Sequence, residues 1–108
     1  LEIPCAHDAL LGLYNVDPFK SFYFQAMHPF VYSKKAIEFL VEKSGLKLEA
    51  YIPKQRYGLS NHLQWLRAGT PGGNQTYETA FTQITHSSYK KDLENSGYND
   101  TAYFLLTK

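Results

Sequence analysis

The chain has 108 residues, of which 44% are hydrophobic and 19% are charged, a balance typical of one small globular domain or part of one. Its net charge of +1 and its lack of a basic stripe argue against nucleic-acid binding, because a phosphate backbone must be neutralised by several cations. With one cysteine and no apolar run near the ~20 residues of a membrane span, the chain is expected to be cytoplasmic, with neither a disulfide framework nor a membrane contact.

The first residues predict the end of a β-strand. Leu1, Glu2 and Ile3 alternate between apolar and acidic, and Pro4 ends the run because proline cannot donate a hydrogen bond to a sheet. Since a natural chain rarely begins inside a strand, we expect these residues to continue a longer polypeptide.

A short helix and then an aromatic run are expected next. Leu10, Leu13 and Tyr14 share one face at helical spacing. Tyrosine and phenylalanine are suited to the walls of pockets and to interfaces, because they combine a large apolar body with, in tyrosine, a polar end. The run consists of Phe19, Phe22, Tyr23, Phe24, Phe30 and Tyr32.

Residues 33–44 predict an amphipathic helix. Ser33 can accept a hydrogen bond from an early amide of the helix, and Gly45 supplies the left-handed residue that ends many helices. Residues 46–52 then alternate with period two, which predicts a strand that Pro53 ends. The apolar stripe of the predicted helix consists of Ala36, Ile37, Leu40 and Val41.

The rest of the chain predicts helices and a final strand. One helix is expected over 61–68, and a loop over 69–73 follows because its glycines and proline break any element. A longer helix is expected over 77–96. Residues 101–107 predict a strand that is covered on both faces, since nearly all of its residues are apolar.

Two segments resemble bacterial methyltransferases that accompany saccharide or cell-surface glycan synthesis. They are FYFQAMHPFVYS at 22–33 and QRYGLSNHLQWL at 55–66, which the turn PGG at 71–73 follows. The turn SGLKLE at 44–49 resembles the helix-to-strand turn of the whole superfamily. Together they make the chain similar to the C-terminal portion of a class I S-adenosylmethionine-dependent methyltransferase.

The resemblance implies an α/β fold in which the chain forms the end of a seven-stranded, Rossmann-like sheet. Residues 1–4 would be the stub of strand five, residues 5–32 the segment on the acceptor side, and residues 33–52 the next helix with strand six. Residues 53–100 would form a helical insertion. Residues 101–107 would be strand seven, which in this family runs antiparallel between strands five and six.

The resemblance also implies a function. The full-length parent would transfer a methyl group from S-adenosylmethionine to a small molecule such as a sugar or sugar nucleotide. In this family the cofactor is bound by a glycine-rich loop after strand one and an acidic residue that ends strand two. Neither pattern occurs here, because the glycine cluster at 69–73 follows a predicted helix. Most cofactor contacts would therefore come from an N-terminal half, and this piece alone should be inactive.

Ligands of open α/β sheets lie beyond the carboxyl ends of the parallel strands, so residues 4–32 should border the pocket. His28 and Tyr32 are candidates there, and His28 could act as a general base if the acceptor is a hydroxyl group. In the alternative interpretation His28 caps a turn before Pro29. The adjacent His7 and Asp8 could orient an imidazole, unless the two side chains point apart.

A polar and aromatic cluster provides the other candidates. Arg56 could hold a phosphate or carboxylate through two hydrogen bonds, and Trp65 could stack on a flat or sugar ring. Alternatively, the helix simply packs on the sheet and its polar groups are satisfied locally. No metal site is expected, because the histidines lack ligand spacing and Cys5 has no second cysteine. The substrate-binding candidates are Tyr32, Arg56, Tyr57, Asn61, His62 and Trp65.

A rival interpretation is a self-standing protein-interaction or ligand-binding module without catalysis. Its tyrosine-rich surface would then form the interface. A piece of a methyltransferase sheet would instead leave an open edge, through which a homodimer or a swapped oligomer could form.

Overall fold

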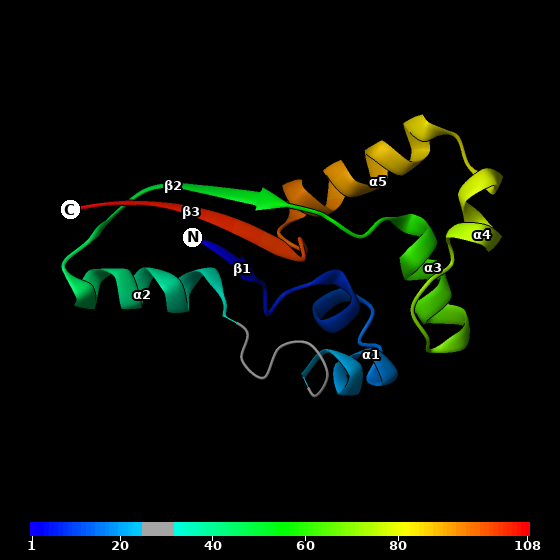
Figure 1. The fold of residues 1–108 in the computed structure, drawn as a ribbon, viewed down its shortest axis with the longest axis horizontal. Coiled ribbons are helices and arrows are strands. Elements are labelled where there is room, and N and C mark those ends of the chain that lie inside the picture. The colour runs from blue at the N-terminus through cyan, green and yellow to red at the C-terminus, as the bar shows by residue number, and fades with distance from the viewer. Residues whose placement is uncertain (25–31) are drawn as a thin grey trace.

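The computed structural model describes residues 1–24 and 32–108. The chain has a mixed α/β fold, with α2 beneath a small sheet and the other helices grouped beyond one end of that sheet (Figure 1). In chain order the elements are β1 (Glu2–Pro4), η1 (Ala9–Leu13), α1 (Asp17–Phe22), α2 (Lys34–Ser44), β2 (Lys47–Lys54), α3 (Leu59–Ala68), α4 (Asn74–Tyr77), η3 (Glu78–Ala80), α5 (Gln83–Ser96) and β3 (Thr101–Thr107).

The last strand lies between the two earlier ones, in the order β1-β3-β2. β3 runs antiparallel to both neighbours, so β1 and β2 run parallel to each other. The register pairs Ile3 with Ala102 and Tyr51 with Phe104. This strand order and these directions confirm the arrangement expected for the final strands, while the methyltransferase identity of the sheet stays a prediction.

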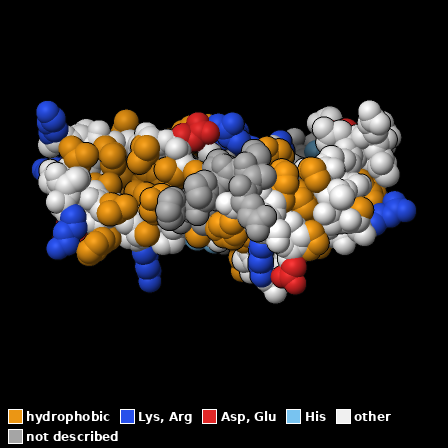
Figure 2. All heavy atoms as spheres, turned by 60° about the horizontal axis from the view of Figure 1, so that its bottom comes forward, with side chains coloured by type: hydrophobic (Ala, Val, Ile, Leu, Met, Phe, Trp, Pro, Cys, Tyr) orange, Lys and Arg blue, Asp and Glu red, His pale blue; other side chains and the backbone are white. Residues whose placement is uncertain are grey.

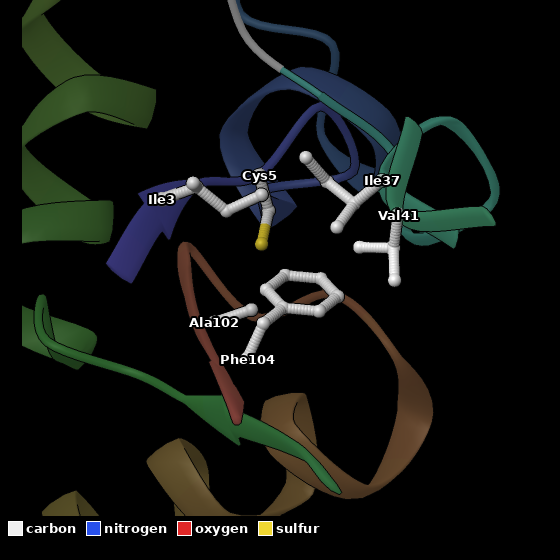
Figure 3. Packing of buried hydrophobic residues seen from close by; sticks show 6 residues of the cluster. All are labelled: Ile3, Cys5, Ile37, Val41, Ala102 and Phe104. Atoms are coloured by element: carbon white, nitrogen blue, oxygen red, sulfur yellow. The ribbon is translucent and has the colours of Figure 1, made fainter. Parts of the chain in front are cut away.

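Helix α2 covers one face of the sheet and forms a hydrophobic core with it. Because side chains alternate along a strand, Ala102 and Phe104 of β3 point to the same face, with exposed fractions of 0% and 2%. Figure 3 shows the core side chains converging from β1, β3 and α2. The cluster consists of Ile3, Cys5, Ile37, Val41, Ala102 and Phe104.

The ends of α2 follow the sequence prediction closely. The Ser33 hydroxyl accepts a hydrogen bond from the amide of Ala36 at 3.1 Å, and Gly45 ends the helix with a φ of 80°. One member of the predicted apolar stripe is misplaced, because Leu40 is 49% exposed, beside Phe39, which is 58% exposed. Figure 2 shows hydrophobic side chains gathered on this face of the molecule, over α2.

Strand β2 runs past the proline that was expected to end it. Pro53 pairs with Ala102 and Lys54 with Thr101, so the strand extends to Lys54. Among the described residues β2 pairs with β3 alone and is an edge strand. Proline is tolerated on an edge because a missing N–H on the open side removes no hydrogen bond from the sheet.

The helix expected over 77–96 is wrong in its first part. A turn of α-helix and a 3-10 turn (η3) come first, and then Phe81 is extended, with φ −129° and ψ 152°. The Thr82 hydroxyl accepts from the amide of Thr85 at 3.3 Å and starts α5 anew. Helix α1 was not expected, and its start is favoured by Pro18, whose fixed φ suits a first turn.

The expectation that β3 is covered on both faces is also wrong for the described residues. Leu105 is 58% exposed, on the face of the sheet opposite α2, and Ile52 of β2 is 53% exposed. Among the described residues the outer edges of β1 and β2 are also unpaired by other strands. The expected homodimer or swapped oligomer requires such an edge, and it stays a prediction.

Replacing Phe104 by alanine should destabilise the chain by about 3–5 kcal/mol, because it opens a cavity between the sheet and α2. The matched substitution Leu105→Ala, one residue along the strand but solvent-exposed, should cost about 1 kcal/mol or less. Urea unfolding followed by circular dichroism measures both. Equal losses from the two variants would contradict the assignment of the two faces.

Candidate functional site

A cavity of about 280 Å³ lies beyond the carboxyl end of β1. For residues 4–24, its position agrees with the expectation that the segment after β1 borders a pocket, because η1 and α1 supply much of its wall. The opposite wall comes from α3 and from the residues just before β3. The lining residues are Glu2, Ile3, Pro4, Asp8, Leu10, Phe19, Phe22, Tyr23, Tyr57, Asn61, His62, Trp65, Pro71, Asp100 and Thr101.

Aromatic rings from α1 and α3 form the apolar wall. Spacings of three and four residues put Phe19, Phe22 and Tyr23 on one side of α1. The Trp65 ring, 3% exposed, packs at 79° against Phe19 with centroids 5.0 Å apart, and its centroid lies 5.2 Å from that of Phe22. These rings belong to a second core that holds α1 against α3 and also includes Leu10 and Val16.

The carboxylate of Asp100 fixes the loop that follows β2. It accepts hydrogen bonds from the amides of Arg56 and Tyr57, each at 2.9 Å, and from Nε2 of Gln55 at 3.0 Å. Oε1 of Gln55 in turn accepts from the amide of Asp100 at 3.0 Å. Burial raises the pKa of Asp100, and the hydrogen bonds from the two amides act in the opposite direction.

His62 is buried and neutral at physiological pH. Desolvation lowers its pKa to about 4, and its Nδ1 lies 2.6 Å from the hydroxyl of Tyr89 on α5. That hydroxyl lies 2.8 Å from the hydroxyl of Tyr14, so a chain of hydrogen bonds links α3, α5 and the end of η1. His62 is therefore satisfied by groups far away in the sequence, while its ring still borders the cavity.

Asp8 is a carboxyl group of the cavity wall with an exposed fraction of 2%. Its Oδ1 accepts from the amide of Leu10 at 2.9 Å and caps η1. Burial raises the pKa of Asp8 to about 7, the Leu10 amide opposes the rise, and the nearby Asp100 adds to it. Asp8 was considered as a partner of His7 and not as a wall residue. Its position, just after a strand end and just before a helix, is the signal that could have identified it.

Four of the predicted substrate-binding residues are brought together by the fold. Tyr57, Asn61, His62 and Trp65 all line the cavity. They come from the loop after β2 and from the side of α3 that faces α1. The sequence did not identify Asp8, Asp100 or the α1 rings as their neighbours, since these contacts depend on how distant elements pack.

The remaining predicted residues lie elsewhere. The guanidinium of Arg56 pairs with Glu2 and donates to the Tyr103 hydroxyl at 3.1 Å, and Arg56 lines a second cavity of about 490 Å³. Tyr32 lines neither cavity, and its carbonyl accepts from the amide of Ala6 at 3.1 Å. His28, the predicted base, lies outside the described residues.

The glycine run after α3 does not fit a cofactor-binding loop. A Cβ atom on Gly73 would collide with the carbonyl oxygen of Ser60 and would lie 2.9 Å from Cβ of Gln64. Gly73, with a φ of 97°, is therefore required for the close approach of α4 to α3. The run also follows a helix, whereas a nucleotide-binding loop follows a strand.

Comparisons with protein-family models, with curated proteins and with solved structures found no match. Within the described part of the chain, no helix is long and apolar enough to cross a membrane. Across residues 1–24 and 32–108, no three His, Cys, Asp or Glu side chains gather in a way that could hold a metal ion. The function must therefore be inferred from the chemistry of the cavity and from the sequence resemblance.

Replacing Asp8 by asparagine should stabilise the chain at pH 8 by the order of 2 kcal/mol. The amide keeps the hydrogen bond from Leu10 and removes a charge that burial disfavours. The folded-state pKa of about 7 exceeds the ordinary value of 3.8, so the stability contributed by Asp8 is complete below pH 3.8 and is lost as the pH rises through 7. The gain from the variant should therefore shrink as the pH falls towards 4.

Urea unfolding of wild type and variant at pH 8 and pH 4 measures this difference. Because both proteins retain His62, the acid titration of that residue cancels in the comparison. Asp92→Asn, on the exposed side of α5, is the control and should change stability little at either pH. An Asp8→Asn gain that is the same at both pH values would refute the raised pKa.

Proposed function

We propose that these residues form the acceptor-binding part of a class I S-adenosylmethionine-dependent methyltransferase that acts on a small molecule such as a sugar or sugar nucleotide. The observation that carries the proposal is the cavity at the carboxyl end of β1, in a sheet whose last strand runs antiparallel between the other two. That position is where α/β sheets bind ligands. The resemblance at 22–33 and 55–66 supports the same conclusion.

The size and lining of the cavity suit a single ring. Its volume of about 280 Å³ lies just below the range of drug-sized ligand pockets, roughly 300–1,000 Å³. The rings of Tyr57 and Phe22, which are less buried than Trp65, offer an apolar surface for a sugar ring, and Asn61 offers an amide for its hydroxyl groups. A hexose-sized acceptor fits this combination of surfaces.

The second cavity extends the first one and supports a two-part acceptor. Tyr57, Asn61 and Pro71 line both cavities. Lys90 and Arg56 border the second cavity; the Lys90 cation suits the phosphates of a sugar nucleotide, while the Arg56 guanidinium is already paired with Glu2. In this arrangement the sugar lies in the first cavity, called the aromatic cavity below, and the phosphates lie in the second cavity.

The role of these residues in the reaction would be to hold and orient the acceptor. Methyl transfer requires the accepting atom to lie in line with the methyl group, and a rigid binding wall fixes that geometry. The residues here do not fit a cofactor-binding loop, so the S-adenosylmethionine site would be formed by other residues of the polypeptide. We therefore expect the 108-residue chain alone to be inactive.

Replacing Tyr57 by alanine in the complete polypeptide that carries these residues should raise the acceptor KM about tenfold, the equivalent of one lost aromatic contact of about 1.4 kcal/mol. The fold should persist, because Asp100 holds the backbone amide of Tyr57 and the side chain is 55% exposed. Transfer of labelled methyl groups to a panel of hexoses and sugar nucleotides, with acceptor and cofactor titrated separately, measures the effect.

Tyr32→Ala is the matched control, since Tyr32 is also an exposed tyrosine but lines neither cavity. It should leave the acceptor KM unchanged, and neither variant should alter the KM for S-adenosylmethionine. Equal effects of the two variants on the acceptor KM would contradict the placement of the acceptor. Absence of any methyl transfer by the complete polypeptide would contradict the proposed function itself.

A further inference from the structure

The charges around the aromatic cavity are of one sign. Its described lining includes the carboxyl groups of Glu2, Asp8 and Asp100 and contains no lysine or arginine. His62 adds no positive charge at neutral pH, because its pKa is lowered to about 4. Arg56 pairs with Glu2 from outside the lining, so the acidic charge that a ligand meets in this cavity comes mainly from Asp8 and Asp100.

The three carboxyl groups differ in what already binds them. Asp100 accepts from two backbone amides and one side-chain amide, and Glu2 is paired with Arg56. Asp8 accepts one hydrogen bond, from the Leu10 amide to Oδ1, and no other described residue donates to its carboxyl group. Asp8 is 98% buried in the cavity wall, and its second oxygen accepts no hydrogen bond from a described residue, so a donor on a ligand would satisfy it.

The aromatic rings of the same wall favour a cation. The negative face of an aromatic ring attracts an ammonium group, and the attraction grows when the site excludes water. Phe19, Phe22, Tyr23, Tyr57 and Trp65 all border the cavity that Asp8 faces. The combination of a carboxylate with an aromatic enclosure is typical of sites that bind ammonium groups.

We propose that this cavity binds a positively charged amino group of the acceptor, held by the Asp8 carboxylate and the surrounding aromatic rings. The inference rests on the proposed function and narrows its substrate class to amino sugars and their nucleotide derivatives. The ammonium group fixes the orientation of the acceptor. A neutral sugar leaves the buried Asp8 without its partner, and an anionic sugar is repelled by Asp8 and Asp100.

Three sugars of the same ring size and different charge test the inference. Isothermal titration calorimetry of the complete polypeptide, with glucosamine, glucose and glucuronate as probes at pH 7, where the amino group of glucosamine is mostly protonated, should show glucosamine binding at least tenfold more tightly than glucose, with glucuronate weakest. If glucose or glucuronate binds as tightly as glucosamine, the inference is wrong and the sugar-binding function stands. If none of the three binds, the sugar acceptor and the inference are both wrong.

Asp8→Asn separates charge recognition from a structural role. The asparagine keeps the hydrogen bond from Leu10, so glucosamine affinity should fall about tenfold while glucose affinity stays the same. Asp92→Asn should change neither affinity. Equal weakening of both sugars by Asp8→Asn would mean that the residue only shapes the cavity, and would overturn the inference.

Choline provides a test that needs no variant, because its charge does not change with pH. Burial raises the pKa of Asp8 to about 7, so choline should bind several-fold more tightly at pH 8 than at pH 6. Asp100, Cys5, Tyr23 and Tyr89 are the titratable groups that interact electrostatically with Asp8, and His62 and Glu2 line the same cavity.

Burial raises the pKa of Cys5 to about 12 and that of both tyrosines, so all three stay protonated from pH 6 to pH 8. His62 stays neutral over that interval, because its pKa is about 4. A rise in affinity therefore reports ionisation within the buried pair of Asp8 and Asp100, both of which line the cavity. Equal choline affinity at the two pH values would overturn the inference.

Discussion

The buried carboxylate of Asp100 holds together the parts of the chain on which the cavity depends. It accepts hydrogen bonds from the amides of Arg56 and Tyr57 and so joins the loop after β2 to the start of β3. The Gln55 side chain adds two hydrogen bonds to the same residue, one to its carboxylate and one from its amide. Removing any one donor from a buried carboxylate lowers the stability of the fold, because the remaining negative charge is less well compensated. The position of the cavity wall at Tyr57 therefore follows from this one residue.

The sheet and the cavity form one arrangement. Because β3 lies between β1 and β2, the residues just before it reach the same end of the sheet at which β1 and β2 stop. The chain after β1 supplies Asp8 and the α1 rings there, and the chain after β2 supplies Tyr57 and α3. Segments distant in the sequence thus meet at one place, which combines buried acids with aromatic rings.

Local signals predicted local structure well. The caps at Ser33 and Gly45 defined α2, and the largely apolar run at 101–107 defined β3 to the residue. On one predicted helix, the sequence singled out His62 and Trp65 as candidates, and both line the cavity. The features that the sequence did not predict depend on tertiary contacts. Pro53 is tolerated because β2 is an edge strand, and the Asp8 and α1 walls depend on packing between α1 and α3.

The most direct test is a crystal structure of the complete polypeptide with S-adenosylhomocysteine and glucosamine. The account predicts that the sugar ring lies against Tyr57, that its ammonium group lies within hydrogen-bonding distance of Asp8, and that residues other than these 108 hold the nucleoside. A sugar bound elsewhere, or an aromatic cavity filled by side chains of the same polypeptide, would contradict the assignment of this cavity as the acceptor site.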